Sequence, residues 1–365
     1  MLRARVAVVA GFGNARDSEG GLAMGAAARS EIDIDLDLPG KRLGTIGLVH
    51  SDDRHAFSRI PVPIAAIVGG DGPGVMLSAG THGDEYEGQA VMQALLREIE
   101  PADVAGRLYI LPALNYPAVL AEARCSPLDG GNLNRVFPGD PRLGPTSALA
   151  AILAREVMPR VRYAMDLHSG GRSSRYTPCT YLHWGGDAAH RRSKLAGARA
   201  FGAPSVVVSA GTANPGSMTA ECDRRGIVMV STELGGGGTI DRRMLAIGRE
   251  GVRRALAHWG ILRGEHAPEA PTAMPRLLLL QGREGSPMAE ADGVFEPTRE
   301  LDDEVSPGDE AGLVYPVGEI SRPALRARFA THGVVVSRRV PALVRRGDLL
   351  YNVASPVTEA ELGLS

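Results

Sequence analysis

The sequence predicts an α/β fold in which a mixed β-sheet is flanked by helices, followed by a small all-β C-terminal domain. Three observations lead to this prediction. Between about residues 51 and 262, short apolar runs typical of buried strands alternate with longer stretches of helical periodicity. A Pro- and Ala-rich stretch at 264–274 indicates a linker. Beyond it, short strand-like runs are separated by Gly and Pro turns, which favours an all-β arrangement.

The individual elements follow from the period of the apolar residues. Residues 1–50 are expected to form an N-terminal extension with strands, one of them half-exposed at 32–38, where apolar and acidic residues alternate. In the α/β region, strands are expected at 64–68, 75–79, 108–111, 163–167, 206–208 and 227–230. Helices are expected at 85–100, 147–158, 188–201 and 242–259. In the β-rich domain, assigned to 275–356, strands are expected at 277–280, 293–295, 312–315, 333–336 and 347–351.

The composition excludes several classes of protein. With 44% hydrophobic and 22% charged residues, the 365-residue chain has the composition of a soluble globular protein. A net charge of -2 provides no basic surface for nucleic acid, and no apolar run approaches the roughly 20 residues needed to cross a bilayer. Its three cysteines, Cys125, Cys179 and Cys222, are odd in number and far apart. They predict a reducing, cytoplasmic compartment and no disulfide framework.

The stretch around which the chain is organised runs from the apolar strand 75–79 into a helical pattern. Gly80 ends the strand, and His82 and Glu85 follow with two residues between them. Side chains three residues apart, where a strand turns into a helix, can both point at one cation. His-x-x-Glu alone occurs by chance in many proteins, so this metal-site interpretation needs a further ligand.

A second histidine stands at the end of another predicted strand. His168 follows the apolar run 163–167 and precedes the glycine turn Gly170–Gly171. Two His and one Glu with an open fourth position form a known catalytic zinc arrangement. Asp166 is a candidate for orienting a ligand histidine, or else an ordinary polar residue at a strand end. His183 also follows a strand-like run, but it lacks a ligand partner at suitable spacing, and we expect a surface or core role for it.

Two further stretches carry polar residues suited to catalysis. The segment 124–139 has the composition of a loop and contains Arg124, Asn134 and Arg135. Arg can grip a planar carboxylate with two hydrogen bonds, although a solvated surface loop would also carry arginines. Glu233 ends a predicted strand and precedes four glycines, where it could act as a general base on a metal-bound water. Alternatively it caps a helix starting near Thr239, or the glycines cradle a phosphate.

Four segments, in this order, resemble the aspartoacylase/succinylglutamate desuccinylase branch of the zinc carboxypeptidase superfamily. They are Thr81–Glu85, Asn132–Gly139, Asp166–Gly171 and Thr232–Gly235. The resemblance extends from about residue 60 to 262, and the trailing β-rich segment is similar to the family's C-terminal domain. Within the branch, Asp84–Gly88 and Glu233–Thr239 most resemble the N-alpha-acetyl-L-2,4-diaminobutyrate deacetylases of ectoine breakdown.

The resemblance implies a fold and a metal. The fold is a zinc-carboxypeptidase-like mixed sheet flanked by helices, with a zinc-dependent deacylase catalytic domain at 51–262 and the small β-rich domain at 275–356. One zinc ion per chain is implied, with His82, Glu85 and His168 as its ligands.

The resemblance also implies roles for the remaining polar residues. Glu233 would be the catalytic base, Asn134 and Arg135 would hold the carboxylate of the substrate, and Arg124 would help polarise the scissile carbonyl. In the resembled family, the small β domain narrows the mouth of the site and admits only small substrates.

The expected function is that of a zinc-dependent amidohydrolase removing an acyl group, acetyl in the first instance, from an N-acyl amino acid such as N-alpha-acetyl-L-2,4-diaminobutyrate. The partner is then a small-molecule N-acyl amino acid, with no nucleic acid and no membrane, and homo-oligomer formation stays open. Alternatives are a succinylglutamate desuccinylase or aspartoacylase-type deacylase and a carboxypeptidase acting on small peptides. The hypothesis from another class is a metal-binding protein without catalysis.

Overall fold

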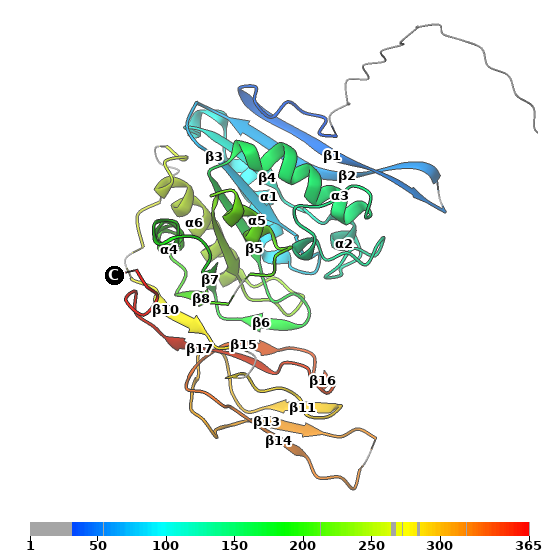
Figure 1. The fold of residues 1–365 in the computed structure, drawn as a ribbon, viewed down its shortest axis with the longest axis vertical. Coiled ribbons are helices and arrows are strands. Elements are labelled where there is room, and N and C mark those ends of the chain that lie inside the picture. Colours follow the sequence, from blue (N-terminus) through cyan, green and yellow to red (C-terminus); the bar gives the residue numbers. More distant parts are fainter. Residues whose placement is uncertain are drawn as a thin grey trace, which may run out of the picture. The chain divides into compact units, whose positions relative to one another are not determined.

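The computed structural model describes residues 31–53, 55–211, 213–263, 268–271, 273–282, 285–318 and 320–364, and within them it confirms the mixed α/β fold (Figure 1). A large sheet forms the centre. Its strands are, in order across the sheet, β1 (Gly40–Asp52), β2 (His55–Val68), β4 (Arg107–Leu111), β3 (Gly74–Ala79), β5 (Tyr163–His168), β9 (Val228–Glu233), β7 (Cys179–His183), β8 (Ser205–Ser209), β10 (Arg276–Leu280), β17 (Tyr351–Pro356), β15 (Gly333–Arg339) and β12 (Glu304–Val305). The short strand β6 (Ser174–Tyr176) pairs with β15.

The middle of this sheet is parallel, and helices cover both of its faces. Strands β4, β3, β5 and β9 run parallel to one another, whereas β7 runs antiparallel to β9. One face packs against α1 (Tyr86–Glu98), α4 (Ala188–Phe201) and α6 (Arg242–His258), and the other against α3 (Pro145–Ile152) and α5 (Met218–Arg224). The side chains of β3 alternate between the two cores, which explains why this strand is an uninterrupted apolar run. Among the described residues, no helix is both long and apolar enough to cross a membrane.

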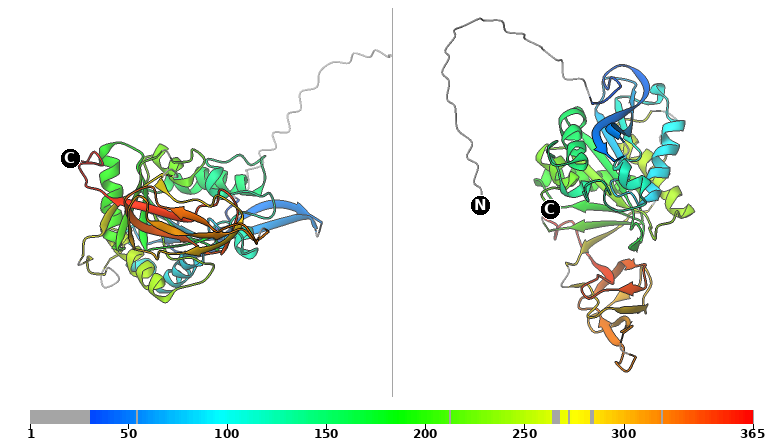
Figure 2. Two further views of the ribbon diagram at one scale, coloured as in Figure 1. Left: turned by 90° about the horizontal axis from the view of Figure 1, so that it is seen from below. Right: turned by 90° about the vertical axis from the view of Figure 1, so that its right-hand side faces the viewer.

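The β-rich C-terminal part has a core of its own but shares the large sheet. A second sheet contains β14 (Leu325–Arg328), β13 (Glu310–Tyr315), β11 (Gly293–Pro297) and β16 (Leu343–Val344). It packs around Phe295, Phe329 and Tyr351. Strand β10, however, pairs in parallel with β8 and antiparallel with β17, so hydrogen bonds connect both parts of the chain (Figure 2). The domain boundaries proposed from the sequence stay a prediction.

Several predicted elements differ from those in the structure. Residues 32–38 form a single antiparallel bridge, between Ile32 and Ile46, and no strand. The carboxylate of Asp33 accepts the backbone N–H of Thr45 and that of Asp35 accepts the N–H of Asp37, so side chains take hydrogen bonds that a longer ladder would use. Residues 147–158 are helical only to Ile152, after which the chain forms a π-helical turn and a 3-10 turn. The predicted strand 347–351 is a turn that leads into β17. The N-terminal extension to residue 30 lies outside the described residues.

Helix α1 approaches strand β5 closely through Gly88. A Cβ atom at this position would lie 2.6 Å from both the Cβ and the carbonyl oxygen of Leu167, the residue before His168. The helix therefore needs a residue without a side chain here, although glycine is a poor helix former. Since Glu85 is the cap residue of the same helix, this contact also determines how near Glu85 comes to His168.

We predict that Gly88→Ala destabilises the protein by about 1–3 kcal/mol, because overpacking outweighs the roughly 1 kcal/mol that alanine contributes to an isolated helix. The melting temperature and the bound metal content should both fall. Gly282→Ala is the control, since nothing lies within 4 Å of a Cβ there. An unchanged melting temperature for Gly88→Ala would contradict the proposed contact.

Candidate active site

His82 and Glu85 meet at the carboxyl end of β3. Gly80, with a φ of 71°, turns the chain out of the strand, and the carbonyls of Ala79 and Gly80 accept the N–H groups of Leu114 and Asn115. The turn is therefore anchored to the neighbouring segment. It brings Nδ1 of His82 to 2.7 Å from Oε1 of Glu85. The two residues are on one side of the turn, as their spacing predicted.

His168, the last residue of β5, completes the cluster. Its Nδ1 atom lies 2.7 Å from Oε2 of Glu85, so the carboxylate lies between two imidazole rings whose centroids are 5.0 Å apart. The three ligand atoms all lie within 4.8 Å of one another, and the residues are only 3%, 3% and 8% exposed. Two imidazoles and one carboxylate, buried together, form a donor set that suits zinc. Nε2 of His82 is buried without a described partner, and the group as a whole fits a cation.

The electrostatics of the cluster favour a cation at its centre. Burial lowers the pKa of His82 despite the neighbouring Glu85. Burial also acts on His168, but the carboxylates of Asp166 and Glu85 outweigh it and raise the pKa of His168 well above its ordinary value. Against its burial, Glu85 has a lowered pKa because both imidazoles face it. A carboxylate held ionised between two rings attracts positive charge, and metal binding would release the proton that His168 holds.

Asp166 contacts the His168 ring at the nitrogen that does not face Glu85. Its Oδ2 atom lies 2.8 Å from Nε2 of His168, on the side of the ring opposite to Glu85. Ser78 donates a hydrogen bond to Oδ1 at 2.8 Å, and Thr81 donates to both oxygens at 3.0 and 2.9 Å. The fully buried carboxylate thus orients the imidazole, as the sequence had suggested for Asp166. Sequence analysis missed Ser78 and Thr81, although a serine inside the apolar run 75–79 was a signal.

Glu233 lies next to His168 across the parallel ladder of β5 and β9. The two residues are directly paired, so both stand at the same edge of the sheet. Oε2 of Glu233 is buried and has no described partner. Burial, together with the negative charge of Glu85, raises its pKa well above the ordinary value. The alternative in which Glu233 caps a helix is wrong, because α6 begins at Arg242 with Asp241 as its cap.

The glycine tract after Glu233 is held by a buried acid from α1. The N–H of Gly236 donates to Oε1 of Glu87 at 3.2 Å, and the N–H groups of Gly237 and Gly238 donate to the carbonyl of Gly171. All four glycines, 235–238, have positive φ, which favours glycine. The tract therefore shapes the backbone beside Glu233. Sequence reasoning missed the part that Glu87 takes in this.

The loop predicted to bind substrate brings two arginines to the same region. Nη1 of Arg124 donates to Oε1 of Glu85 at 3.2 Å, with 47% of the Arg124 side chain exposed. Arg135 lies close enough to Arg124 that burial and the second positive charge lower its pKa. Two neighbouring guanidinium groups favour an anion between them. Asn134 accepts the N–H of Met218 at 2.9 Å, which attaches this loop to the start of α5.

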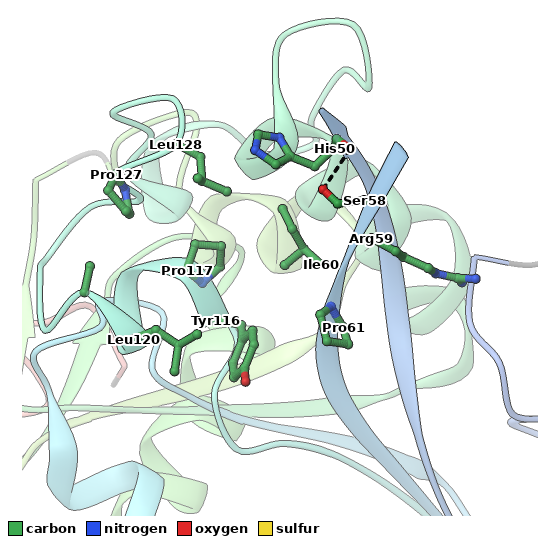
Figure 3. A pocket seen from close by; sticks show the side chains of 11 residues that line it. His50, Ser58, Arg59, Ile60, Pro61, Tyr116, Pro117, Leu120, Pro127 and Leu128 are labelled. Atoms are coloured by element: carbon green, nitrogen blue, oxygen red, sulfur yellow. Dashed lines mark hydrogen bonds between the residues drawn. The ribbon is translucent and has the colours of Figure 1, made fainter. Parts of the chain in front are cut away.

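A separate apolar hollow of about 340 Å³ lies beside this loop (Figure 3). Ile60 and Pro61 of β2 form one side of it, Tyr116 and Leu120 of α2 (Tyr116–Leu120) another, and Leu128 reaches it from the loop. None of the six residues His82, Glu85, Arg124, Arg135, His168 and Glu233 lines this hollow. It is therefore distinct from the candidate metal centre.

Comparisons with known proteins found proteins similar to this chain in sequence and in fold. A family model described as the succinylglutamate desuccinylase/aspartoacylase catalytic domain matches residues 71–259. An N-alpha-acetyl-L-2,4-diaminobutyric acid deacetylase from Halomonas elongata is 36% identical over 325 residues, covering 89% of this chain and 94% of that protein. The product-bound structure of the ectoine utilization protein EutE (DoeB) from Ruegeria pomeroyi is 36% identical with a TM-score of 0.85, covering 90% of this chain and 99% of that one. A succinylglutamate desuccinylase/aspartoacylase structure from Rhodobacter sphaeroides is also 36% identical, with a TM-score of 0.84 over 90% of this chain and all of the other.

We predict that Asp166→Asn weakens zinc binding about 10- to 100-fold, because the substituted amide no longer offers His168 a charged acceptor. Competition with a chromophoric chelator measures the affinity. Asp71→Asn, in an exposed turn, is the matched control. If Asp166→Asn bound zinc as tightly as the parent, Asp166 would be only a buried strand residue.

Proposed function

Because this chain belongs to the succinylglutamate desuccinylase/aspartoacylase family, we propose that it is a zinc-dependent hydrolase that removes the acetyl group from N-alpha-acetyl-L-2,4-diaminobutyrate. It is an enzyme of a family whose members are named as deacylases of N-acyl amino acids. One observation carries the zinc assignment: His82, Glu85 and His168 converge within 4.8 Å at the edge of the sheet where Glu233 also lies. The substrate is taken from the name of the relative from Halomonas elongata, an N-alpha-acetyl-L-2,4-diaminobutyric acid deacetylase.

Residues His82, Glu85 and His168 would hold the zinc ion. Zinc in such a site acts as a Lewis acid and makes water nucleophilic at neutral pH. Glu233 takes a proton from the attacking water, since its free oxygen lies at the same edge of the sheet. The oxygen of that water forms a bond to the acetyl carbon, and the C–N bond breaks. Glu233 then returns the proton to the leaving amine, so the products are acetate and the free amino acid.

The two arginines bind different groups of the substrate. Arg124, beside Glu85, donates to the carbonyl oxygen as negative charge develops there, and such a donor typically contributes about 100- to 1,000-fold in rate. Arg135 and Asn134 hold the α-carboxylate of the amino acid. A bound carboxylate removes the repulsion between the arginines, and it fixes the amide before the reaction begins.

The β-rich part supports a small substrate over a peptide. Strand β6, which follows His168 closely, pairs with Ser337–Arg339 in β15. Asn352 of β17 donates to the hydroxyl of Tyr176 at 3.4 Å and to Ser337 at 2.7 Å. The C-terminal part is thus attached to the catalytic side of the chain, where it would restrict access. A carboxypeptidase acting on small peptides is the less favoured alternative, as is a desuccinylase or aspartoacylase-type deacylase.

A metal-binding protein without catalysis is disfavoured by Glu233, whose enclosed oxygen has no structural hydrogen bond in the described part of the chain. We place the enzyme in the cytoplasm, in keeping with Cys125, Cys179 and Cys222 as free thiols. The partner is a small molecule, and no membrane or nucleic acid is involved.

We predict that Glu233→Gln keeps its zinc and loses about 10²- to 10⁴-fold in kcat for N-alpha-acetyl-L-2,4-diaminobutyrate, because the amide cannot accept the proton. Released acetate gives the rate and metal analysis gives the zinc content. Glu250→Gln, exposed on α6, is the control. Hydrolysis by the loaded Glu233→Gln protein at the parental rate would end the assignment of Glu233 as base.

Replacing Arg135 by methionine should raise KM for the same substrate about 10- to 100-fold and change kcat less, since Arg135 is assigned to the carboxylate rather than to the reacting amide. The substrate with its carboxylate converted to an amide should be hydrolysed at the same rate by the parent protein and by Arg135→Met. Arg142→Met serves as control, because this arginine is 86% exposed on the following part of the loop. If Arg135→Met lost the same factor in kcat/KM on the acid and on the amide, Arg135 would not bind the carboxylate.

A further inference from the structure

Glu87 is a buried acid in the first turn of α1, two residues after the proposed metal ligand Glu85. Glu85 faces two imidazoles and Arg124, whereas Glu87 forms no ion pair with any described residue. A buried carboxyl group without a cation is costly unless it makes hydrogen bonds. What Glu87 binds therefore indicates why an acid occupies this position.

Glu87 binds the backbone that follows Glu233. Its Oε1 atom accepts the N–H of Gly236 at 3.2 Å, and both groups are buried. Gly235 packs against the same oxygen, since a Cβ atom at this position would lie 3.2 Å from Oε1. The carboxyl group of Glu87 thus adjoins the second and third residues after Glu233.

The same stretch is also bonded to the end of β5. The N–H of Leu234 donates to the carbonyl of His168 at 3.0 Å. The carbonyl of Gly235 accepts the N–H of Gly170 at 3.1 Å. Backbone hydrogen bonds from β5 and the turn after it therefore hold this stretch together with the bond from Glu87.

Asp84, on the other side of Glu85 in the sequence, makes a corresponding contact to the turn after β5. Its Oδ2 atom accepts the N–H of Arg172 at 2.9 Å, and a Cβ atom at Gly171 would lie 2.6 Å from Oδ2. The acids on both sides of Glu85 thus bind two different turns. The turn that Asp84 binds follows a strand ending in a proposed metal ligand, whereas the turn that Glu87 binds follows the proposed base.

The orientation of the Glu233 carboxylate depends on this backbone. Its Oε2 atom is buried and has no hydrogen-bond partner in the described part of the chain, so the main chain on either side of Glu233 decides where the oxygen points. Before Glu233 that main chain is strand β9, and after it comes the stretch that Glu87 holds. A displaced base is costly, because a shift of about 1 Å can lower a rate about 100-fold.

We propose that Glu87 is a positioning residue for Glu233, and that its hydrogen bond to Gly236 keeps the base directed at the metal centre. This inference rests on the proposed function, because it gives Glu87 a part in the same reaction. Glu87 acts through the backbone and takes no part in proton transfer. Since Glu85 caps the helix that carries Glu87, one element then holds a metal ligand and the base. An acid with a merely structural role would affect stability, zinc binding and kcat together.

The test replaces Glu87 in the zinc-loaded full-length protein. Glu87→Met should lower kcat for N-alpha-acetyl-L-2,4-diaminobutyrate about 10- to 100-fold and leave KM within about threefold and zinc affinity unchanged, because only the base is displaced. Glu87→Gln should recover most of kcat, since its amide oxygen still accepts the N–H of Gly236. Glu98→Met, exposed near the end of the same helix, is the matched control.

A double-mutant cycle separates positioning of the base from general damage to the fold. If Glu87 acts through Glu233, Glu87→Met should not lower the residual rate of the Glu233→Gln protein any further, because the base is already absent. An equal fold-loss in both backgrounds would overturn the proposal. So would a Glu87→Gln protein as slow as Glu87→Met.

Hydrogen exchange provides a readout that does not depend on turnover. Deuterium uptake by a peptide covering residues 234–238 should rise in Glu87→Met and match the parent in Glu87→Gln and Glu98→Met. Thermal unfolding checks folding, and Glu87→Ala takes the place of Glu87→Met if that protein does not fold. If the parent did not hydrolyse the substrate but uptake still rose, the proposed reaction would fail and the contact with Gly236 would stand. Unchanged uptake in the folded variant would overturn the positioning role.

Discussion

The site depends on the parallel register of β3, β5 and β9. This ladder pairs Ser78 with Asp166 and His168 with Glu233, so residues from distant parts of the sequence end at one edge of the sheet. Strand pairing has a period of two, and a slip by one residue would turn His168 to the other face. Glycine at position 88 then lets α1 come near enough for Glu85 to contact both histidines. Backbone geometry, more than any one side chain, assembles the cluster.

Because the cluster is buried, its charged groups need hydrogen-bonding partners from the protein. In a poorly solvated site, an ionised Glu85 needs hydrogen-bonding partners, which the two imidazoles supply. Asp166 in turn needs the hydroxyls of Ser78 and Thr81. Glu233 differs, because its free oxygen has no described partner and its pKa is raised. The oxygens of Asp166 accept hydrogen bonds and orient His168, whereas Oε2 of Glu233 has no described hydrogen bond and is free to accept a proton.

The local parts of this structure could be predicted from the sequence, and the non-local parts could not. His82, Glu85, His168 and Glu233 each lie at or just after the end of an apolar strand and have a glycine within two residues, so their positions were readable from short windows. Helix α4 was predicted with its actual bounds, since its apolar period is clear. The pairing of β8 with β10 joins segments on either side of α5, β9 and α6, and no local pattern encodes it. His183 was assigned a surface or core role because its partners lie in helices whose packing is invisible in sequence.

Strand β7 lies beside β9, the strand that carries Glu233, but runs in the opposite direction. It runs antiparallel to β9, so Cys179 pairs with Glu233 while His183 stands four residues further along, about 13 Å away at 3.3 Å per residue. Had β7 been parallel, its last residue would have shared the edge with Glu233. Reversal of this strand carries His183 to α5 and Lys194 instead, where its ring is held neutral. The direction of β7 therefore decides that Cys179, and not His183, stands beside Glu233 at the edge of the sheet where the metal ligands meet.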